Sequence, residues 1–380
     1  MRAGIYLYPW DLKDAGASAL VARLGDAGIS AIHLATSYHA GKFLRPHGSS
    51  GKVYFPQDGT VYFHPDPSLY GRIKPRVADL IKDFDPLSVL AKTAPDLERI
   101  AWTVGLHNTP LGQQHPDLTA RTVFGDPLFN SLCASQPDVR NFLTALCCDI
   151  ARNQPVAEVS VETPGWQAFR HGHHHEFELI ELTASTETLL GLCFCDACKL
   201  GATSCGIGFD ALKTMAADAL ERFFADGTEP GFDPLADPEW RAFHTWRAEQ
   251  VTSLVRRIRS EMPRDVRLSI IPTTQSPNAL CLTEGSDLAA LSRVADALEI
   301  PSYQNGVSAM TDDIVKTREL VRGSDNLGYI LRPSYPNLTD ASQVRAAVQM
   351  LKGQGAKSIS FYNYGHMRLQ SLDWIRAALT

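Results

Sequence analysis

Short apolar, β-rich runs alternate along the chain with longer stretches whose apolar residues repeat at helical spacing. Eight runs of the first kind are predicted as strands, at 4–8, 31–35, 100–106, 157–161, 266–271, 297–300, 327–331 and 358–362. Helices are predicted at 15–27, 86–94, 139–153, 209–224, 239–261, 287–294, 311–321, 341–352 and 372–378. Because strands alternate with helices throughout, the sheet is expected to be parallel.

Eight strand–helix units are the number that closes a barrel, so we predict an α/β fold, a (β/α)8 TIM barrel forming a single domain over 1–380. The alternative is an open doubly wound sheet, which usually carries a glycine-rich phosphate loop after its first strand. Here that strand continues into Tyr8-Pro9-Trp10-Asp11. The loops after strands two, three and four hold most of the extra length, and the longest is an inserted excursion over about 162–238. In barrels such loops build the active-site face.

Composition and charge narrow the class of partner. Hydrophobic residues make up 44% of the 380 residues and charged residues 21%, which is enough apolar material for a large core. The formal net charge is −6, so neither nucleic acid nor an anionic membrane is expected as a partner, while a homo-oligomer stays open. No stretch reaches the roughly 18 apolar residues of a membrane span. The first segment is interpreted as a core strand and not as a signal peptide, so we expect a cytoplasmic location.

Polar residues at the predicted strand ends mix aromatic rings with hydrogen-bonding groups. That combination suits a sugar, whose ring stacks on flat faces and whose hydroxyls need partners. The predicted substrate site consists of Tyr8, Trp10, His39, Arg45, His107, Asn108, Trp166, His173, His174, Glu176, Tyr303, Arg332, Tyr362 and Asn363. Nucleotide binding is not expected, because the chain has no glycine-rich phosphate nest, and no organic cofactor is predicted.

Two glutamates are predicted at the carboxyl ends of strands. Glu162 follows Val159-Ser160-Val161, and Glu299 lies within Leu298-Glu299-Ile300-Pro301, where a carboxylate between apolar neighbours needs a reason. Glycoside hydrolysis typically uses two carboxyl groups that flank the anomeric carbon. The leading hypothesis is therefore a glycoside hydrolase with Glu162 as general acid/base and Glu299 as the second carboxylate. The alternative is that each glutamate only pairs with a barrel arginine or histidine.

The segment Arg170-His171-Gly172-His173-His174-His175-Glu176 is the densest polar cluster of the chain. Imidazoles and a carboxylate are ligands for a divalent metal, so a second hypothesis is a metal-dependent sugar isomerase, epimerase or lyase that uses the His173–Glu176 cluster. The cluster lacks the helical His-x-x-x-His spacing of a zinc protease. Two other interpretations are contact with substrate from an irregular loop over the barrel, and a solvated loop whose histidines only cap backbone groups.

Three of the eight cysteines form a Cys-x-Cys-x-x-Cys pattern at Cys193, Cys195 and Cys198. Three thiolates at this spacing can bind one tetrahedral zinc ion and leave one position for a fourth ligand. Cys205 is close in sequence, whereas Cys133 is distant but precedes the predicted helix at 139–153, on the same barrel face. A closed cysteine site would be structural and not catalytic. Unmetallated thiols packed in a loop are the alternative.

This motif, downstream of Glu162 and of Cys133-Ala134-Ser135-Gln136-Pro137, resembles that of hypothetical glycoside-hydrolase barrels described as alpha-amylase-like or beta-galactosidase-like. The resemblance implies that Cys133, Cys193, Cys195 and Cys198 bind a structural zinc and that Glu162 takes the strand-four acid/base position. Such beta-galactosidases place their nucleophile on strand seven, where this chain has Leu331-Arg332-Pro333. The second carboxylate is therefore expected elsewhere, at Glu299. The same gap motivates a third hypothesis, a barrel that binds a glycan without cleaving it.

Overall fold

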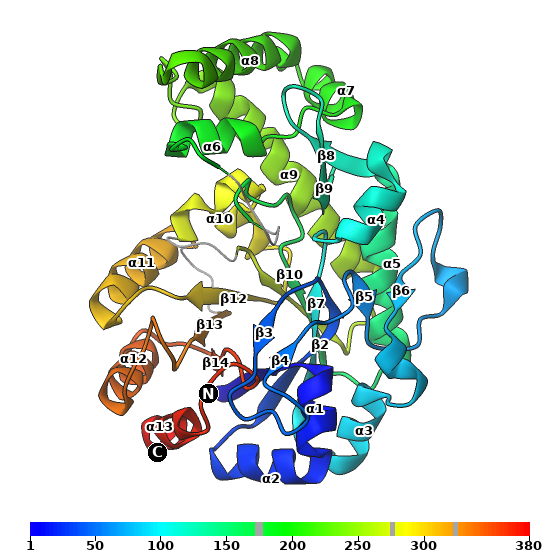
Figure 1. Cartoon of the computed structure of the whole chain (residues 1–380), viewed down its shortest axis with the longest axis vertical. Coiled ribbons are helices and arrows are strands. Elements are labelled where there is room, and N and C mark those ends of the chain that lie inside the picture. Colours follow the sequence, from blue (N-terminus) through cyan, green and yellow to red (C-terminus); the bar gives the residue numbers. More distant parts are fainter. Residues whose placement is uncertain (172–177, 274–277, 322–325) are drawn as a thin grey trace.

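The computed structural model describes residues 1–171, 178–273, 278–321 and 326–380. Its centre is a closed ring of parallel strands: β1 (Arg2–Leu7), β2 (Ala31–Tyr38), β7 (Glu98–Val104), β10 (Glu158–Glu162), β11 (Arg267–Ile271), β12 (Ala297–Ser302), β13 (Leu327–Leu331) and β14 (Ser358–Phe361). The ring closes because β1 pairs in parallel with both β2 and β14. The predicted (β/α)8 barrel is thereby confirmed (Figure 1).

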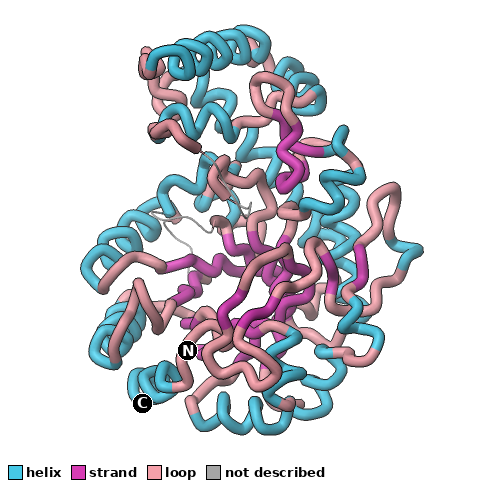
Figure 2. The backbone as a smooth tube through the Cα atoms, viewed as in Figure 1, coloured by secondary structure: helices cyan, strands magenta, loops and turns pink. Residues whose placement is uncertain are grey.

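Helices surround the ring of strands, as Figure 2 shows. They are α1 (Pro9–Ala15), α2 (Ala17–Asp26), α3 (Pro86–Thr93), α5 (Pro137–Asn153), α9 (Pro238–Glu261), α10 (Leu288–Leu291), α11 (Val307–Leu320), α12 (Ala341–Gly353) and α13 (Gln370–Leu379). In α12 the buried residues Val344, Ala347, Val348 and Leu351 are three or four positions apart. This spacing places them on one face of the helix, which packs against the barrel.

The long loops contain small elements of their own. After β2 come β3 (Phe43–Leu44), β4 (Val53–Tyr54), β5 (Thr60–Val61), η1 (Pro67–Leu69), β6 (Arg76–Val77) and η2 (Asp79–Lys82). After β7 come α4 (Thr109–Gln114), η3 (Pro116–Leu118), β8 (Thr119–Arg121) and β9 (Pro127–Leu132). After β10 come α6 (Ala184–Gly191), α7 (Asp196–Ser204) and α8 (Phe209–Asp226), which lie beyond the ring at the top of Figure 1, and η4 (Asn278–Glu284) follows β11.

The barrel interior changes from one end to the other. Aromatic residues such as Tyr8 and Trp102 form a buried cluster near the carboxyl ends of the strands, which we call the mouth. Below it, Tyr6 stacks on the buried His33 with ring centroids 4.3 Å apart. At the amino ends of the strands the interior is charged. None of the described helices has the length and hydropathy needed to span a bilayer.

Candidate active site

Glu162 is the last residue of β10, at the carboxyl end of the barrel. In the sheet it pairs with Val104 of β7 and with Ile271 of β11. The indole of Trp102, on β7, donates a hydrogen bond of 2.6 Å from Nε1 to Glu162 Oε2. The backbone carbonyl of Glu162 accepts from the N–H of Gly105 at 3.0 Å. Both the backbone and the side chain of this glutamate are therefore fixed by the neighbouring strand.

The protonation state of Glu162 follows from its surroundings. Its carboxyl group lies deep in the mouth, and burial raises the pKa to about 7, although the hydrogen bond from Trp102 and the charge of Arg332 act in the opposite direction. At pH 7 about half of the molecules then carry the proton. A carboxylic acid in this range can donate a proton to a leaving group at neutral pH.

The residue after Glu162 has an unusual backbone conformation. Thr163 has a φ of 46°, and no other described residue except glycine has a positive φ. A β-branched residue in the left-handed region is strained by roughly 1–3 kcal/mol. The conformation is held by a hydrogen bond of 3.0 Å from the Thr163 N–H to the Ile271 carbonyl. Strain of this kind clusters at functional sites, which fits a role for Glu162.

Three tyrosine hydroxyls meet beside Glu162. Tyr8 Oη donates to Tyr38 Oη at 2.9 Å and lies 3.0 Å from Tyr362 Oη. His366 approaches the same Tyr8 hydroxyl with Nε2 at 3.3 Å. Burial raises the pKa of all three tyrosines, so they remain neutral and act as hydrogen-bond donors and acceptors. Such a group can hold sugar hydroxyls in place.

Arg332 follows β13 and lies across from this cluster. Its guanidinium carbon is 3.6 Å from the ring centroid of Tyr303 and 5.1 Å from that of Tyr362. Of the predicted substrate residues, the structure therefore gathers Tyr8, Tyr303, Arg332 and Tyr362 around Glu162.

Two further predicted residues, His39 and His107, stack on one flank of the mouth. Their ring centroids are 4.2 Å apart, and His39 also stacks on Tyr38 at 4.3 Å. His171 extends this row, with its ring 5.3 Å from that of His107. The three histidines come from the loops after β2, β7 and β10. His173, His174 and Glu176, which were predicted beside it, lie outside the described residues.

Five predicted substrate residues have structural contacts instead. Trp10 stacks between Tyr8 and Tyr54, at 4.4 and 4.8 Å. Arg45 is buried in ion pairs of 2.9 Å with Asp11 and Asp14. Asn108 caps α4, because its Oδ1 accepts from the Leu111 N–H. Trp166 is fully buried beneath the Arg247 guanidinium, and Asn363 Oδ1 accepts from the Gly365 N–H.

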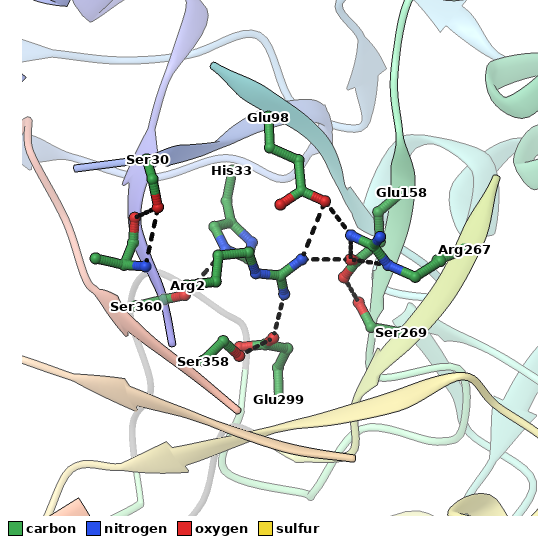
Figure 3. A network of polar contacts seen from close by, with 11 residues as sticks. Arg2, Ser30, His33, Glu98, Glu158, Arg267, Ser269, Glu299, Ser358 and Ser360 are labelled. Carbon is green, nitrogen blue, oxygen red and sulfur yellow. Dashed lines mark hydrogen bonds and ion pairs between the residues drawn. The ribbon is translucent and has the colours of Figure 1, made fainter. Parts of the chain in front are cut away.

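Glu299 is not at the mouth, and the expectation that it lies at the carboxyl end of its strand has to be corrected. It is the third residue of β12, at the amino end of the barrel, and is fully buried. Arg2 Nη2 donates to its Oε1 at 2.9 Å, and Ser358 Oγ donates to the same oxygen (Figure 3). Glu299 and Glu162 therefore lie at opposite ends of the barrel. The carboxyl–carboxyl distance that separates retaining from inverting glycosidases does not apply to these two residues.

Glu299 belongs to a set of charged residues that we call the amino-end network: Arg2, Glu98, Glu158, Arg267 and Glu299, with Ser269 and Ser358 (Figure 3). Arg2 Nη1 donates to Glu158 Oε2 at 2.7 Å, and Arg267 Nη2 reaches the same oxygen at 2.8 Å. Although burial alone would raise it, the pKa of Glu158 is lowered to about 2 by Arg2. Glu299 therefore fits the alternative given in the sequence analysis, that it pairs with a barrel arginine.

Trp102 was not among the site residues predicted from the sequence. Trp102 sits inside a predicted strand and has the character of a core residue, so no local signal marks it. Tyr38 and His171 were also missing from the predicted site. The signals that could have identified them are the position of Tyr38 at the end of β2 and the position of His171 within the histidine-rich segment.

Four cysteines from two distant segments meet outside the mouth. Cys133, Cys193, Cys195 and Cys198 are buried, and their sulfur atoms all lie within 4.8 Å of one another. Cys133 Sγ is 3.6 Å from the sulfurs of Cys195 and Cys198 and 3.7 Å from that of Cys193. Cys205, the other candidate, is exposed at the end of α7. The cluster joins the segment after β9 to the start of α7.

Comparisons with known proteins bear on the fold. No protein-family model matches the chain, and no curated protein matches its sequence. Among solved structures, the glycoside hydrolase domain of PgaB (BpsB) from Bordetella bronchiseptica is similar, with a TM-score of 0.59 and 14% identity over 100% of this chain and 99% of that chain. The catalytic domain of beta-amylase from Paenibacillus polymyxa gives a TM-score of 0.58 at 10% identity, covering 100% and 97%. Alpha-L-fucosidase isoenzyme 2 from Paenibacillus thiaminolyticus gives 0.55 at 12%, covering 100% and 49%. At these identities the likeness establishes the barrel fold.

Proposed function

We propose that this protein is a glycoside hydrolase and that Glu162 is its general acid. The observation that carries the proposal is the Glu162 carboxyl group at the carboxyl end of the barrel, whose pKa is raised to about 7 and which is held by Trp102 and bordered by tyrosine hydroxyls. Barrel enzymes place their chemistry at this end. Similar folds occur in three proteins whose names describe a glycoside hydrolase, an amylase and a fucosidase, which supports the same class of substrate.

In this proposal the glycosidic oxygen of the substrate lies against Glu162 and receives its proton as the bond breaks. The tyrosine hydroxyls of Tyr8, Tyr38 and Tyr362 bind sugar hydroxyls, and the ring of Tyr303 supports the sugar. The causes that shift the pKa of Glu162 include no second carboxylate of the described chain, whereas paired carboxyl groups raise each other's pKa. Glu176, the carboxylate of the histidine-rich segment, lies outside the described residues.

The metal-dependent isomerase hypothesis has less support. Within the described ranges, the group of side chains whose ligand atoms approach closely enough to hold a metal ion is the four-cysteine cluster. The described histidines of the mouth stack on one another and do not form such a group. A barrel that only binds a glycan is the remaining alternative, and the experiment below separates it from a hydrolase.

The test is a screen of wild-type protein against aryl glycosides of both anomers and a set of oligosaccharides. Release of the aryl alcohol or of new reducing ends is measured, and the Glu162→Gln variant is run in parallel as the control for contaminating enzymes. We expect at least one substrate to be cleaved by the wild type. A sugar that binds and remains intact would support the glycan-binding alternative.

The pH dependence of hydrolysis is expected to report Glu162. A general acid works in its protonated form, so kcat/KM should fall about tenfold per pH unit above a pKa of about 7. The Trp102 hydrogen bond favours the ionised form, so Trp102→Phe should raise this pKa and move the alkaline limb to higher pH. Profiles between pH 5 and 9 measure both effects. An alkaline limb that does not move in Trp102→Phe would contradict the assignment.

We also propose a structural zinc ion at Cys133, Cys193, Cys195 and Cys198. Four thiolates at Zn–S bonds of about 2.3 Å form a tetrahedron with edges of about 3.8 Å. The sulfur separations of 3.6 and 3.7 Å that involve Cys133 match this edge. Four protein ligands complete the coordination, so the ion would join two loops and not take part in catalysis.

Metal analysis tests this site. We expect one zinc ion per chain in wild-type protein, and loss of the ion together with a lower melting temperature in Cys195→Ser, because metal binding contributes to folding. Cys205→Ser is the matched control, since Cys205 is exposed and outside the cluster, and it should keep both properties. Wild-type protein without stoichiometric metal, and with the melting temperature of Cys195→Ser, would exclude the site.

A further inference from the structure

Arg332 is a cation at the mouth that forms no ion pair with the described residues. Its Nε is buried and has no hydrogen-bond partner among the described residues. Arg332 also takes part in none of the ion pairs of the described chain. By contrast, Arg2 and Arg45 each contact two or more carboxylates. Arg332 as a whole is half-buried, but burying its Nε without a partner costs free energy, so the position of this side chain needs a reason.

Arg332 lies against two tyrosine rings at the mouth. The guanidinium lies over the ring of Tyr303 at 3.6 Å and near that of Tyr362 at 5.1 Å. A guanidinium that stacks on an aromatic face keeps its N–H groups in its own plane, where they can bind a planar anion with two hydrogen bonds. Tyr303 and Tyr362 thus support the cation without neutralising it.

The other titratable groups at the mouth do not offset this charge. The charge of Arg332 lowers the pKa of Glu162, but the two residues form no ion pair. Because that pKa is about 7, about half of the Glu162 carboxyl groups are uncharged at pH 7. Burial lowers the pKa of His366, and Arg332 lowers it further, as expected for an imidazole in a positive field. The described groups at the mouth therefore leave the positive charge of Arg332 unbalanced, which favours binding of an anionic group.

We propose that Arg332 binds a carboxylate or sulfate group on the sugar unit next to Glu162, and that the substrates of this protein are acidic glycans. That acidic glycans are substrates, and not only ligands, rests on the proposed hydrolase function. The binding itself rests on the guanidinium of Arg332 beside Tyr303 and Tyr362, which forms no ion pair with a carboxylate of the described residues. A purely structural role for Arg332, holding the two tyrosine rings in place, is the competing explanation.

Binding of free sugars to wild-type protein tests the inference without any need for hydrolysis. The probes are glucuronate and galacturonate, their neutral counterparts glucose and galactose, and glucose 6-sulfate, each titrated by calorimetry at fixed ionic strength. We expect at least one acidic sugar to bind about tenfold or more tightly than its neutral counterpart. The uronates and the sulfate ester distinguish the two sources of the charge.

Three variants complete the design. Arg332→Met should abolish the preference for the acidic sugar, and Arg332→Lys, which keeps the charge without the fork, should keep part of it. Arg345→Met, on the exposed face of α12, changes the net charge equally and should leave the preference intact. The melting temperature of each variant is measured first, and Arg332→Lys serves as the test if Arg332→Met does not fold. Equal binding of acidic and neutral sugars, or a preference that survives in both Arg332 variants, would overturn the inference.

The outcome for hydrolysis is separate. If neutral glycosides are cleaved in a manner that depends on Glu162 and not on Arg332, the hydrolase stands and the acidic-glycan inference fails. If acidic sugars bind through Arg332 and no glycoside is cleaved, the binding inference stands and the hydrolase fails. Where acidic glycosides are cleaved, Arg332→Met should raise KM for them more than it lowers kcat.

Discussion

Glu162→Gln is expected to lower kcat by about 10²- to 10⁴-fold on any glycoside that the wild type cleaves, because the amide cannot donate a proton to the leaving group. The substitution is nearly isosteric, and the oxygen of the amide can still accept the hydrogen bond from Trp102 Nε1. KM should therefore change little. Initial rates at saturating substrate, with melting temperatures for both proteins, measure the effect.

Glu299→Gln is the matched control for that experiment. It makes the same chemical change at a fully buried glutamate, but at the opposite end of the barrel. We expect kcat to stay within a few-fold of the wild type wherever the variant is folded. A loss of turnover in Glu299→Gln as large as in Glu162→Gln would contradict the site described here and restore the two-glutamate hypothesis.

Arg2→Met is expected to lower the free energy of unfolding by about 3 kcal/mol or more. The substitution leaves the buried Glu299 without the arginine that pairs with it, whereas Glu158 keeps its contact with Arg267, and an uncompensated buried charge costs about 3–5 kcal/mol. The Arg2 side chain is 17% exposed, which favours the lower part of this range. Urea denaturation at pH 7 measures the change, and kcat of the folded variant should be retained.

The control for Arg2→Met is Arg376→Met on α13. Arg376 pairs with Asp373 at 2.8 Å, but both side chains are more than half exposed. Such a pair contributes about 0–1 kcal/mol. If the two variants have similar free energies of unfolding, the amino-end network does not hold the barrel together. Recovery of stability in the double variant Arg2→Met/Glu299→Gln would support the explanation by an unpaired charge, because Arg2 is the arginine that pairs with Glu299.

The sequence predicts the strands of this barrel well, but it predicts less well where a given residue lies between the two ends of a strand. The run at 327–331 coincides with β13, because apolar positions buried on both sides mark a parallel strand. The strand predicted at 297–300 is two residues longer in the structure, where β12 continues through Pro301 to Ser302. Proline lacks a ladder donor but can still occupy a strand position. That difference of two residues moved Glu299 from the middle of the strand to its apparent end.

The candidate site was predictable where residues follow a strand directly. Glu162, Tyr8, Arg332 and Tyr362 were found by this rule, and the structure brings them together. The rule fails for Trp102, which points into the barrel from within β7, because a buried aromatic residue in a strand has the pattern of the core. It also selected Arg45 and Asn108, whose polar groups serve the loops that carry them.

The amino-end network also bears on how this barrel can evolve. Its side chains come from six of the eight strands, and they lie at the end of the barrel away from Glu162. Distant sites act independently, so the free-energy effects of Arg2→Met and Glu162→Gln should add. A frame that is stabilised at one end leaves the long loops after β2, β7 and β10 free to diverge. New ligand preferences can then arise at the mouth without a loss of barrel closure.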